Sequence, residues 1–158
     1  MSFKLDAYCG LYCGGCFIMN AYRQNRTDCL PDNWINPIHD KEIKCYGCKS
    51  EIVFENCRGC RIRKCAQSKN IDFCNKCSEF PCEYIKRLVN LDLAHLNLTT
   101  ENLKTIKETG VKKWLENQKN RWLCANCGFP YSWYEQNCVK CGKELFNSIK
   151  ENKVLNHL

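Results

Sequence analysis

Apolar residues recur at three- to four-residue spacing in two stretches beside cysteines, and each stretch predicts a short helix. The first stretch follows Cys16 and contains Phe17, Ile18, Ala21 and Tyr22. The second follows Pro81 and Cys82 and contains Tyr84, Ile85, Leu88 and Leu91. Apolar faces of this kind usually pack into a core, so we expect both helices to be structural.

The pattern predicts two more helices between residues 99 and 122. The first begins near Thr99 or Thr100 as its cap and carries Leu103 and Ile106. The second runs from Val111 to Trp122 and carries Trp114, Leu115 and Gln118. Gly110 separates the two helices, because glycine is a poor residue inside a helix. We expect these tryptophans to pack against the core and not to bind a ligand.

Cysteine is the most unusual component of the composition, with 16 residues in a chain of 158. This density is typical of a secreted disulfide scaffold or of an intracellular metalloprotein. The amino-terminal residues lack the apolar segment of a secretory signal, and no apolar run is long enough to cross a bilayer. We therefore expect a protein of the reducing cytoplasm with no membrane partner.

The spacing of the cysteines favours metal binding over disulfides. Two-residue gaps separate the members of several pairs, among them Cys45/Cys48, Cys57/Cys60, Cys74/Cys77, Cys124/Cys127 and Cys138/Cys141. Such pairs are typical of zinc sites, because each forms a tight loop that directs two sulfur atoms toward one ion. Four zinc ions on sixteen thiolates would also move the formal charge from +7 to about −1. Basicity is then a weak argument for a nucleic-acid partner.

The carboxy-terminal pairs give the clearest pattern in the chain. Cys124 and Cys127 are followed by Gly128, and Cys138 and Cys141 by Gly142. Glycine tolerates the left-handed conformation that a turn of this kind needs. These four cysteines predict one tetrahedral site in a zinc ribbon over residues 121–146. The aromatic residues between the pairs, Phe129, Tyr131, Trp133 and Tyr134, would cover the metal site or bind a partner.

The other twelve cysteines all lie within residues 1–82, and we predict each of them to be a metal ligand. They are Cys9, Cys13, Cys16, Cys29, Cys45, Cys48, Cys57, Cys60, Cys65, Cys74, Cys77 and Cys82. Grouping in chain order would give Cys9/Cys13/Cys16/Cys29, then Cys45/Cys48/Cys57/Cys60, then Cys65/Cys74/Cys77/Cys82. Interleaved groups fit the spacings equally well.

The amino-terminal spacing Cys9-x3-Cys13-x2-Cys16 matches the cluster motif of radical S-adenosylmethionine enzymes. Those enzymes build a large barrel around the cofactor, for which this chain is too short. A zinc or iron–sulfur role for the same cysteines stays open, since iron–sulfur clusters also take thiolates at short gaps.

Other catalytic motifs are missing from the sequence. None of the three histidines, His39, His95 and His157, stands beside a cysteine pair. The chain also lacks the His-x-Glu element of zinc deaminases, a phosphate-binding glycine loop and a nucleophile elbow. We therefore expect no catalytic residues. One catalytic alternative is an open metal position formed by Cys9, Cys13 and Cys16 without Cys29.

Several of these motifs together resemble a known family. CGLYCGGC at 9–16, CYGCKS at 45–50, CRGCRIRKCA at 57–66 and CNKCSEFPCEYIKRL at 74–88 are similar to the bacterial and archaeal cysteine-rich family of unknown function numbered 3795. The resemblance covers residues 1 to about 90 and does not include Cys29. It implies a small metal-binding domain and brings no catalytic residues with it.

These observations predict a small metal-stabilised α+β protein. Its parts would be an irregular, α-containing cysteine-rich domain at residues 1–98, a helical connector at 99–120, a zinc ribbon at 121–146 and a polar tail at 147–158. The expected function is structural binding of about four zinc ions, which shape a surface for a protein or nucleic-acid partner. The alternative is an iron–sulfur protein with a redox role for the amino-terminal cysteines.

Overall fold

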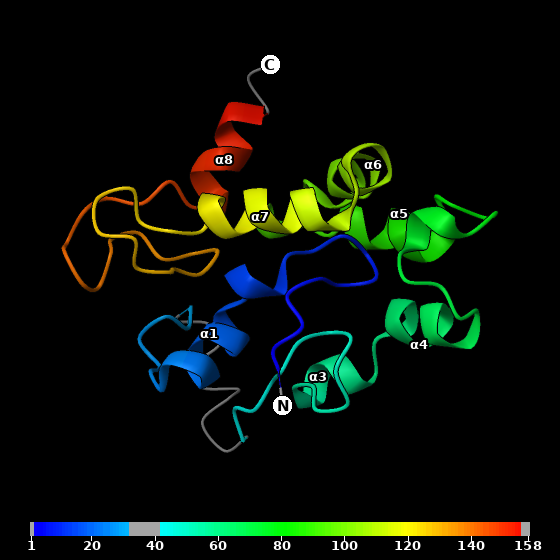
Figure 1. Ribbon diagram of the computed structural model, residues 1–158, viewed down its shortest axis with the longest axis horizontal. Coiled ribbons are helices and arrows are strands. Elements are labelled where there is room, and N and C mark those ends of the chain that lie inside the picture. Colours follow the sequence, from blue (N-terminus) through cyan, green and yellow to red (C-terminus); the bar gives the residue numbers. More distant parts are fainter. Residues whose placement is uncertain (1, 32–41, 156–158) are drawn as a thin grey trace.

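The computed structural model describes residues 2–31 and 42–155. Helices form nearly all of the regular structure in this part of the chain (Figure 1). In chain order they are η1 (Cys13–Gly15), α1 (Phe17–Gln24), α3 (Glu55–Arg58), α4 (Arg61–Ser68), η2 (Cys74–Lys76), α5 (Glu83–Val89), η3 (Ala94–Leu96), α6 (Thr99–Thr109), α7 (Val111–Arg121) and α8 (Ser148–Leu155). His39 and His157 lie outside the described residues.

The helix predicted after Cys16 is confirmed as α1. Its Phe17, Ile18 and Ala21 are buried, as their spacing predicts. The helix ends at Gln24 because Asn25 adopts a left-handed conformation with φ of 51°, which asparagine tolerates better than most residues. α1 therefore places Cys16, its N-cap, against the core of the molecule.

The predicted helix pair is confirmed as α6 and α7, which pack against each other. Leu103, Ile106 and Trp114 are buried, and Gly110 separates the helices with φ of 83°. The structure differs at the start of α6, where Leu98 is the N-cap and Thr99 is already the first helical residue. The predicted helix after Cys82 is α5, in which Ile85 is buried whereas Tyr84 is largely exposed.

The hydrophobic core joins segments that are distant in the sequence. Tyr12 of the amino-terminal segment packs edge-on against Trp114 of α7, with ring centroids 6.2 Å apart. The same core contains Tyr131 and Trp133 from the carboxy-terminal loops. In Figure 1 the amino-terminal segment passes beneath α7, and these loops extend from one side of it.

The predicted α+β class is only partly confirmed, because strands are almost absent. In the described ranges the β-structure consists of three isolated antiparallel bridges, Asp6–Tyr12, Leu123–Pro130 and Asn137–Glu144. Each bridge closes a cysteine-containing loop too short to form a sheet. Among the described helices, none is long and apolar enough to cross a membrane.

Candidate metal centre

The loop that carries Cys124 and Cys127 is a tight turn closed by backbone hydrogen bonds. The amide of Cys124 donates to Phe129 O at 2.9 Å, and the amide of Gly128 donates to Cys124 O at 2.8 Å. Gly128 has φ of 69°, and a Cβ atom there would meet nothing within 4 Å. Glycine is thus favoured by backbone conformation and not by lack of space.

The loop that carries Cys138 and Cys141 repeats this turn. The amide of Cys138 donates to Lys143 O, and the amide of Gly142 donates to Cys138 O, both at 2.8 Å. Gly142 has φ of 72°. The two glycines identified from the sequence therefore occupy equivalent positions in two equivalent turns.

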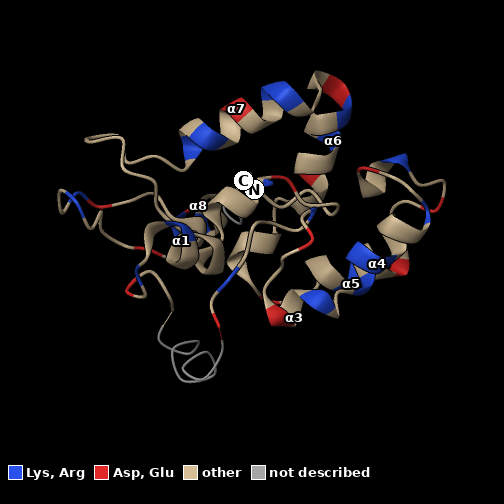
Figure 2. Cartoon of the chain, turned by 60° about the horizontal axis from the view of Figure 1, so that its bottom comes forward, with Lys and Arg blue, Asp and Glu red and all other residues tan. Residues whose placement is uncertain are grey.

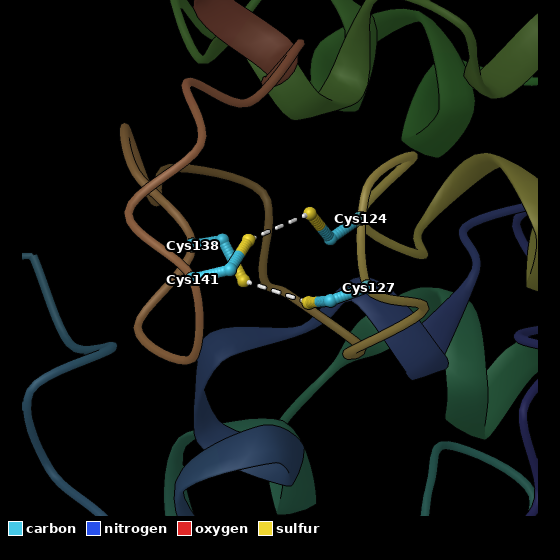
Figure 3. Close-up of side chains that lie close together, drawn as sticks. All are labelled: Cys124, Cys127, Cys138 and Cys141. Carbon is cyan, nitrogen blue, oxygen red and sulfur yellow. Dashed lines mark hydrogen bonds between the residues drawn. The ribbon is translucent and has the colours of Figure 1, made fainter.

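The two turns bring four sulfur atoms together (Figure 3). All four atoms lie within 4.8 Å of one another, with Cys124 Sγ 3.7 Å from Cys141 Sγ and Cys127 Sγ 3.5 Å from Cys138 Sγ. Disulfide sulfurs would be about 2.05 Å apart. A tetrahedral ion with metal–sulfur bonds of about 2.3 Å needs sulfur atoms about 3.8 Å apart, so these cysteines fit a single ion.

Hydrogen bonds from neighbouring groups make this cluster suited to thiolates. The side chain of Asn126 and the amide of Lys143 lower the pKa of Cys141 to about 6. The amide of Phe129 also lowers the pKa of Cys127, but burial and the adjacent thiols raise it to about 12. Four thiols so close together cannot all ionise without a cation. A divalent ion would resolve this conflict by displacing the protons.

Aromatic residues attach these loops to the helices. The ring of Trp133 stacks on His95 with centroids 4.2 Å apart, and its amide donates to Gly15 O at 2.8 Å. Arg121 donates to Tyr131 Oη at 2.7 Å, and Tyr131 Oη also contacts Phe146 O. Tyr131 and Trp133 are both buried, as is Ser132 between them, and the two rings pack between the loops and the helices.

A buried ion pair adds a second attachment. Arg26, just after α1, donates to Glu135 Oε1 at 2.6 Å, and both side chains are largely buried. The other carboxylate oxygen of Glu135 accepts hydrogen bonds from the amide and hydroxyl of Ser132, at 2.6 and 2.9 Å. A buried carboxylate requires hydrogen-bond partners of this kind. This pair carries no local signal in the sequence, because its members are 109 residues apart.

The amino-terminal cysteines form a more open arrangement. None of the sixteen cysteines is paired in a disulfide in this structure. Within the described ranges, only the carboxy-terminal cysteines form a group of three or more potential ligands whose atoms all lie within 4.8 Å. The amino-terminal thiols nevertheless raise one another's pKa in buried surroundings, and these effects group them into three overlapping sets.

The first set surrounds Cys48. Burial raises the pKa of Cys9, and the thiols of Cys48 and Cys60 raise it further. Cys13 responds in the same way, with Cys48 as its strongest thiol neighbour, and the Cys48 amide donates a hydrogen bond to its sulfur. The pKa of Cys48 itself is raised to about 11 by burial, with Cys60 as an additional neighbour.

The second set surrounds Cys45. Burial raises the pKa of Cys16 to about 12 despite hydrogen bonds from the amides of Met19 and Ile18 at the start of α1, and Cys45 and Cys57 raise it further. Burial also raises the pKa of Cys57 to about 12, and Cys45 is again its strongest thiol neighbour.

The third set lies around η2 and the start of α5. Burial raises the pKa of Cys74 to about 12, followed by the effects of Cys82, Cys65 and Cys77. These are the cysteines of one group predicted from chain order. Lys69 donates to Cys77 Sγ at 3.3 Å and to Glu79 at 2.9 Å, so this cation supports a thiol.

Comparison with known proteins identifies the family of this region. The model of the family described as "Protein of unknown function (DUF3795)" matches residues 5–87. The chain belongs to this family. The match confirms the resemblance drawn from the four motifs, and it ends before the carboxy-terminal cysteine loops. No curated protein and no solved structure matches the chain.

Cys29 lies within the DUF3795 region but apart from the three sets of thiols. Its sulfur donates to Phe17 O at 3.6 Å and to Arg26 O at 3.8 Å. Burial raises its pKa to about 11, and the nearby charges are those of Glu135, Arg26 and Asp28. The structure thus places Cys29 beside the buried ion pair and does not bring it to Cys9, Cys13 and Cys16.

Proposed function

We propose that this chain is a zinc-binding module in which the metal ions are structural, with a zinc ribbon at residues 121–146. The observation that supports this most directly is the carboxy-terminal set of four sulfurs, whose separations of 3.5 and 3.7 Å suit one tetrahedral ion. Four thiolates leave no position for water or substrate, which is typical of structural zinc and not of catalytic zinc.

The ion would join the two loops to each other, in addition to the contacts that attach them to the helices. Each loop has one isolated bridge, and their apolar residues face the helices. Small modules of this kind take much of their folding free energy from the metal. The paired spacing of the cysteines, which is typical of metal sites, supports a reducing compartment such as the cytoplasm.

The ordered surface would then bind a macromolecular partner, either protein or nucleic acid. In Figure 2 the cartoon is blue at the lysine and arginine positions of α4. Arg58, Arg61 and Lys64 are exposed there, whereas Arg63 donates to Cys48 O at 2.9 Å and so supports the fold. Exposed arginines suit phosphate contacts. A nucleic-acid partner requires affinity that falls as salt rises, and a protein partner does not.

X-ray absorption at the zinc edge tests the metal assignment. Protein purified without oxygen should contain zinc, and the carboxy-terminal ion should show four sulfur neighbours at about 2.3 Å. The variant Asn126→Ala is a milder check, because the side chain of Asn126 supports Cys141. Loss of such outer hydrogen bonds typically weakens metal binding about 10- to 100-fold. Zinc with oxygen or nitrogen neighbours throughout would contradict the proposal.

The second candidate is an iron–sulfur protein, and one observation favours it for the amino-terminal cysteines. Among the described residues, no three sulfurs of that region form a group compact enough to hold a single ion, unlike the carboxy-terminal four. A cluster places several iron and sulfide atoms between its thiolates, so it needs wider spacing than a single ion. Iron with acid-labile sulfide in the intact protein would favour this candidate, and colourless protein with zinc alone would exclude it.

A further inference from the structure

The segment that joins α5 to α6 buries one of its leucines and leaves two others on the surface. Leu96 of η3 is buried, whereas Leu91 is 51 % exposed and Leu93 is 42 % exposed. The backbone fixes this arrangement, because the amide of Leu93 donates to Leu91 O at 2.7 Å and the amide of Leu96 donates to Leu93 O at 2.9 Å. The exposed leucines therefore belong to an ordered part of the fold.

α8 contacts η3 and so lies beside this segment. Its first residue, Ser148, is buried, and the amide of Ser148 donates to Trp133 O at 2.9 Å. Further along α8, the side chain of Asn97, just after η3, donates to Asn152. Leu155, the last residue of α8, is 39 % exposed. α8 is thus attached near its start and its middle, and its last residue faces solvent.

An open groove with a volume of about 680 Å³ lies between these elements. Its apolar lining residues are Val89, Leu91, Leu98 and Leu155. An exposed apolar surface with polar residues around it is typical of a binding site for another molecule. Every described lining residue follows residue 87, so the groove lies outside the region that matches DUF3795.

The charged residues of the groove are acidic. Asp92 and Glu101 line it, and both are exposed. None of its described lining residues is a lysine or an arginine, although the chain contains 24 of these against 17 acidic residues. Lys104 approaches Glu101 only to 3.9 Å, and an exposed contact of this kind contributes little. The groove therefore favours a partner with positive charge and disfavours the phosphates of a nucleic acid.

We propose that this groove binds a basic, leucine-containing segment of a partner protein. Apolar side chains of the segment contact Leu91, Leu98 and Leu155, and its lysines or arginines pair with Asp92 and Glu101. The inference rests on the proposed role of the chain as a binding module, and it deepens that role by naming a basic protein segment as the partner.

NMR with a synthetic amphipathic peptide of leucine and lysine tests this proposal. The full chain is purified without oxygen and labelled at its leucine methyl groups, and the control is the same peptide with glutamate in place of lysine. The lysine peptide should shift the signals of Leu91, Leu98 and Leu155, and the glutamate peptide should not. Absence of binding by the lysine peptide, or shifts confined to other leucines, would overturn the inference.

A pair of variants tests the apolar contact. Leu91→Ser should weaken binding of the lysine peptide about tenfold, because it removes apolar area that the peptide covers. Ile149→Ser is the control, since Ile149 is 42 % exposed on α8 but does not line the groove. Both side chains are largely exposed, so both variants should fold. Equal affinities of the two variants would overturn the inference.

A second pair of variants tests the charges. Asp92→Asn/Glu101→Gln should weaken binding about fivefold at low salt and by less at high salt. The control, Glu108→Gln/Glu116→Gln, removes two exposed carboxylates from α6 and α7 that do not line the groove. A loss of affinity that is the same in both double variants would show that the peptide responds only to net charge, and would overturn the inference.

The zinc content of each protein separates failure of this inference from failure of the proposed function. If zinc is bound but the lysine peptide is not, only the groove assignment is wrong. If the peptide binds as described to protein without zinc, the groove assignment holds and the metal assignment is wrong. Sedimentation at rising concentration checks for a second copy of the chain in the groove. A dimer that Leu91→Ser dissociates would overturn the inference.

Discussion

The two cysteine-rich regions of this molecule arrange their sulfur atoms in different ways. In the carboxy-terminal loops each pair lies on its own turn with its own glycine, and four sulfurs meet within 4.8 Å. In the amino-terminal region sulfurs from distant segments meet in a buried space, and no group of three comes as close among the described residues. Local turns can form a single-ion site by themselves, whereas the other region depends on how three segments pack.

Metal removal should give the largest difference between the regions. We expect a strong chelator under reducing conditions to unfold the amino-terminal region, because structural zinc contributes about 10 to 16 kcal/mol per ion in small sites. α6 and α7 have apolar contacts and no cysteines, so they should keep more protection. Hydrogen exchange by segment, before and after chelation, measures this. Equal hydrogen-exchange protection of α1 before and after chelation would contradict this prediction.

Removal of single cysteines should separate ligands from structural thiols. Cys124→Ser should lose one ion and expose Trp133, which would shift tryptophan fluorescence to longer wavelength. Cys29→Ser is the matched control, because the Cys29 thiol donates hydrogen bonds to the backbone oxygens of Phe17 and Arg26. It should keep every ion and lose about 1 kcal/mol of stability. Loss of an ion from Cys29→Ser would show that this cysteine is a ligand after all.

Glycine substitutions should show which region depends on close packing. Gly47→Ala combines φ of 108° with a Cβ atom 1.8 Å from Lys4 O, so we expect it to cost about 2 to 5 kcal/mol. Gly142→Ala has only the backbone penalty and should cost about 1 to 2 kcal/mol.

Gly59→Ala is the control for both substitutions. Gly59 has φ of −80°, and a Cβ atom there would meet nothing within 4 Å. Chemical denaturation of the metal-loaded proteins gives the three free energies of unfolding. Similar losses for Gly47→Ala and Gly59→Ala would show that the Lys4 contact does not matter.

The pH dependence of stability that arises from the contact between His95 and Trp133 should be the smallest effect. Burial against Trp133 lowers the pKa of His95 to about 4. The unfolded chain, with a pKa of about 6.5, binds this proton more readily. Stability is therefore complete above pH 6.5 and falls as pH decreases toward 4, by about 1 to 2 kcal/mol between pH 6.5 and pH 5.

His95→Phe keeps an aromatic ring and removes the titration, so its stability should change less over this interval. Comparison of the two proteins is needed because acid also protonates zinc-bound thiolates. Parallel pH profiles for both would contradict a buried neutral His95.

The sequence predicted the features that depend on residues close together in the chain. Helices α1, α6 and α7 follow from apolar spacing, and the two carboxy-terminal turns follow from pairs with a glycine after each. Strands were overestimated, because paired cysteine turns produce single bridges instead of a sheet.

The rest depends on contacts between distant residues. Spacing left the pairing of the amino-terminal cysteines open, since it cannot show that Cys48 meets Cys13 across the Lys4 to Tyr46 contact. Nor does it reveal that Arg26 pairs with Glu135, or that Cys29 turns toward backbone oxygens. The domain boundaries at 98, 120 and 146 stay predictions, and the core includes residues from both sides of the first two.

The most direct test of the central claim is the zinc content of the wild-type chain and of Cys124→Ser, purified side by side without oxygen. The account predicts that the variant contains one zinc ion fewer and keeps all metal bound to the amino-terminal cysteines. Equal zinc contents in the two proteins would contradict a single-ion site formed by Cys124, Cys127, Cys138 and Cys141.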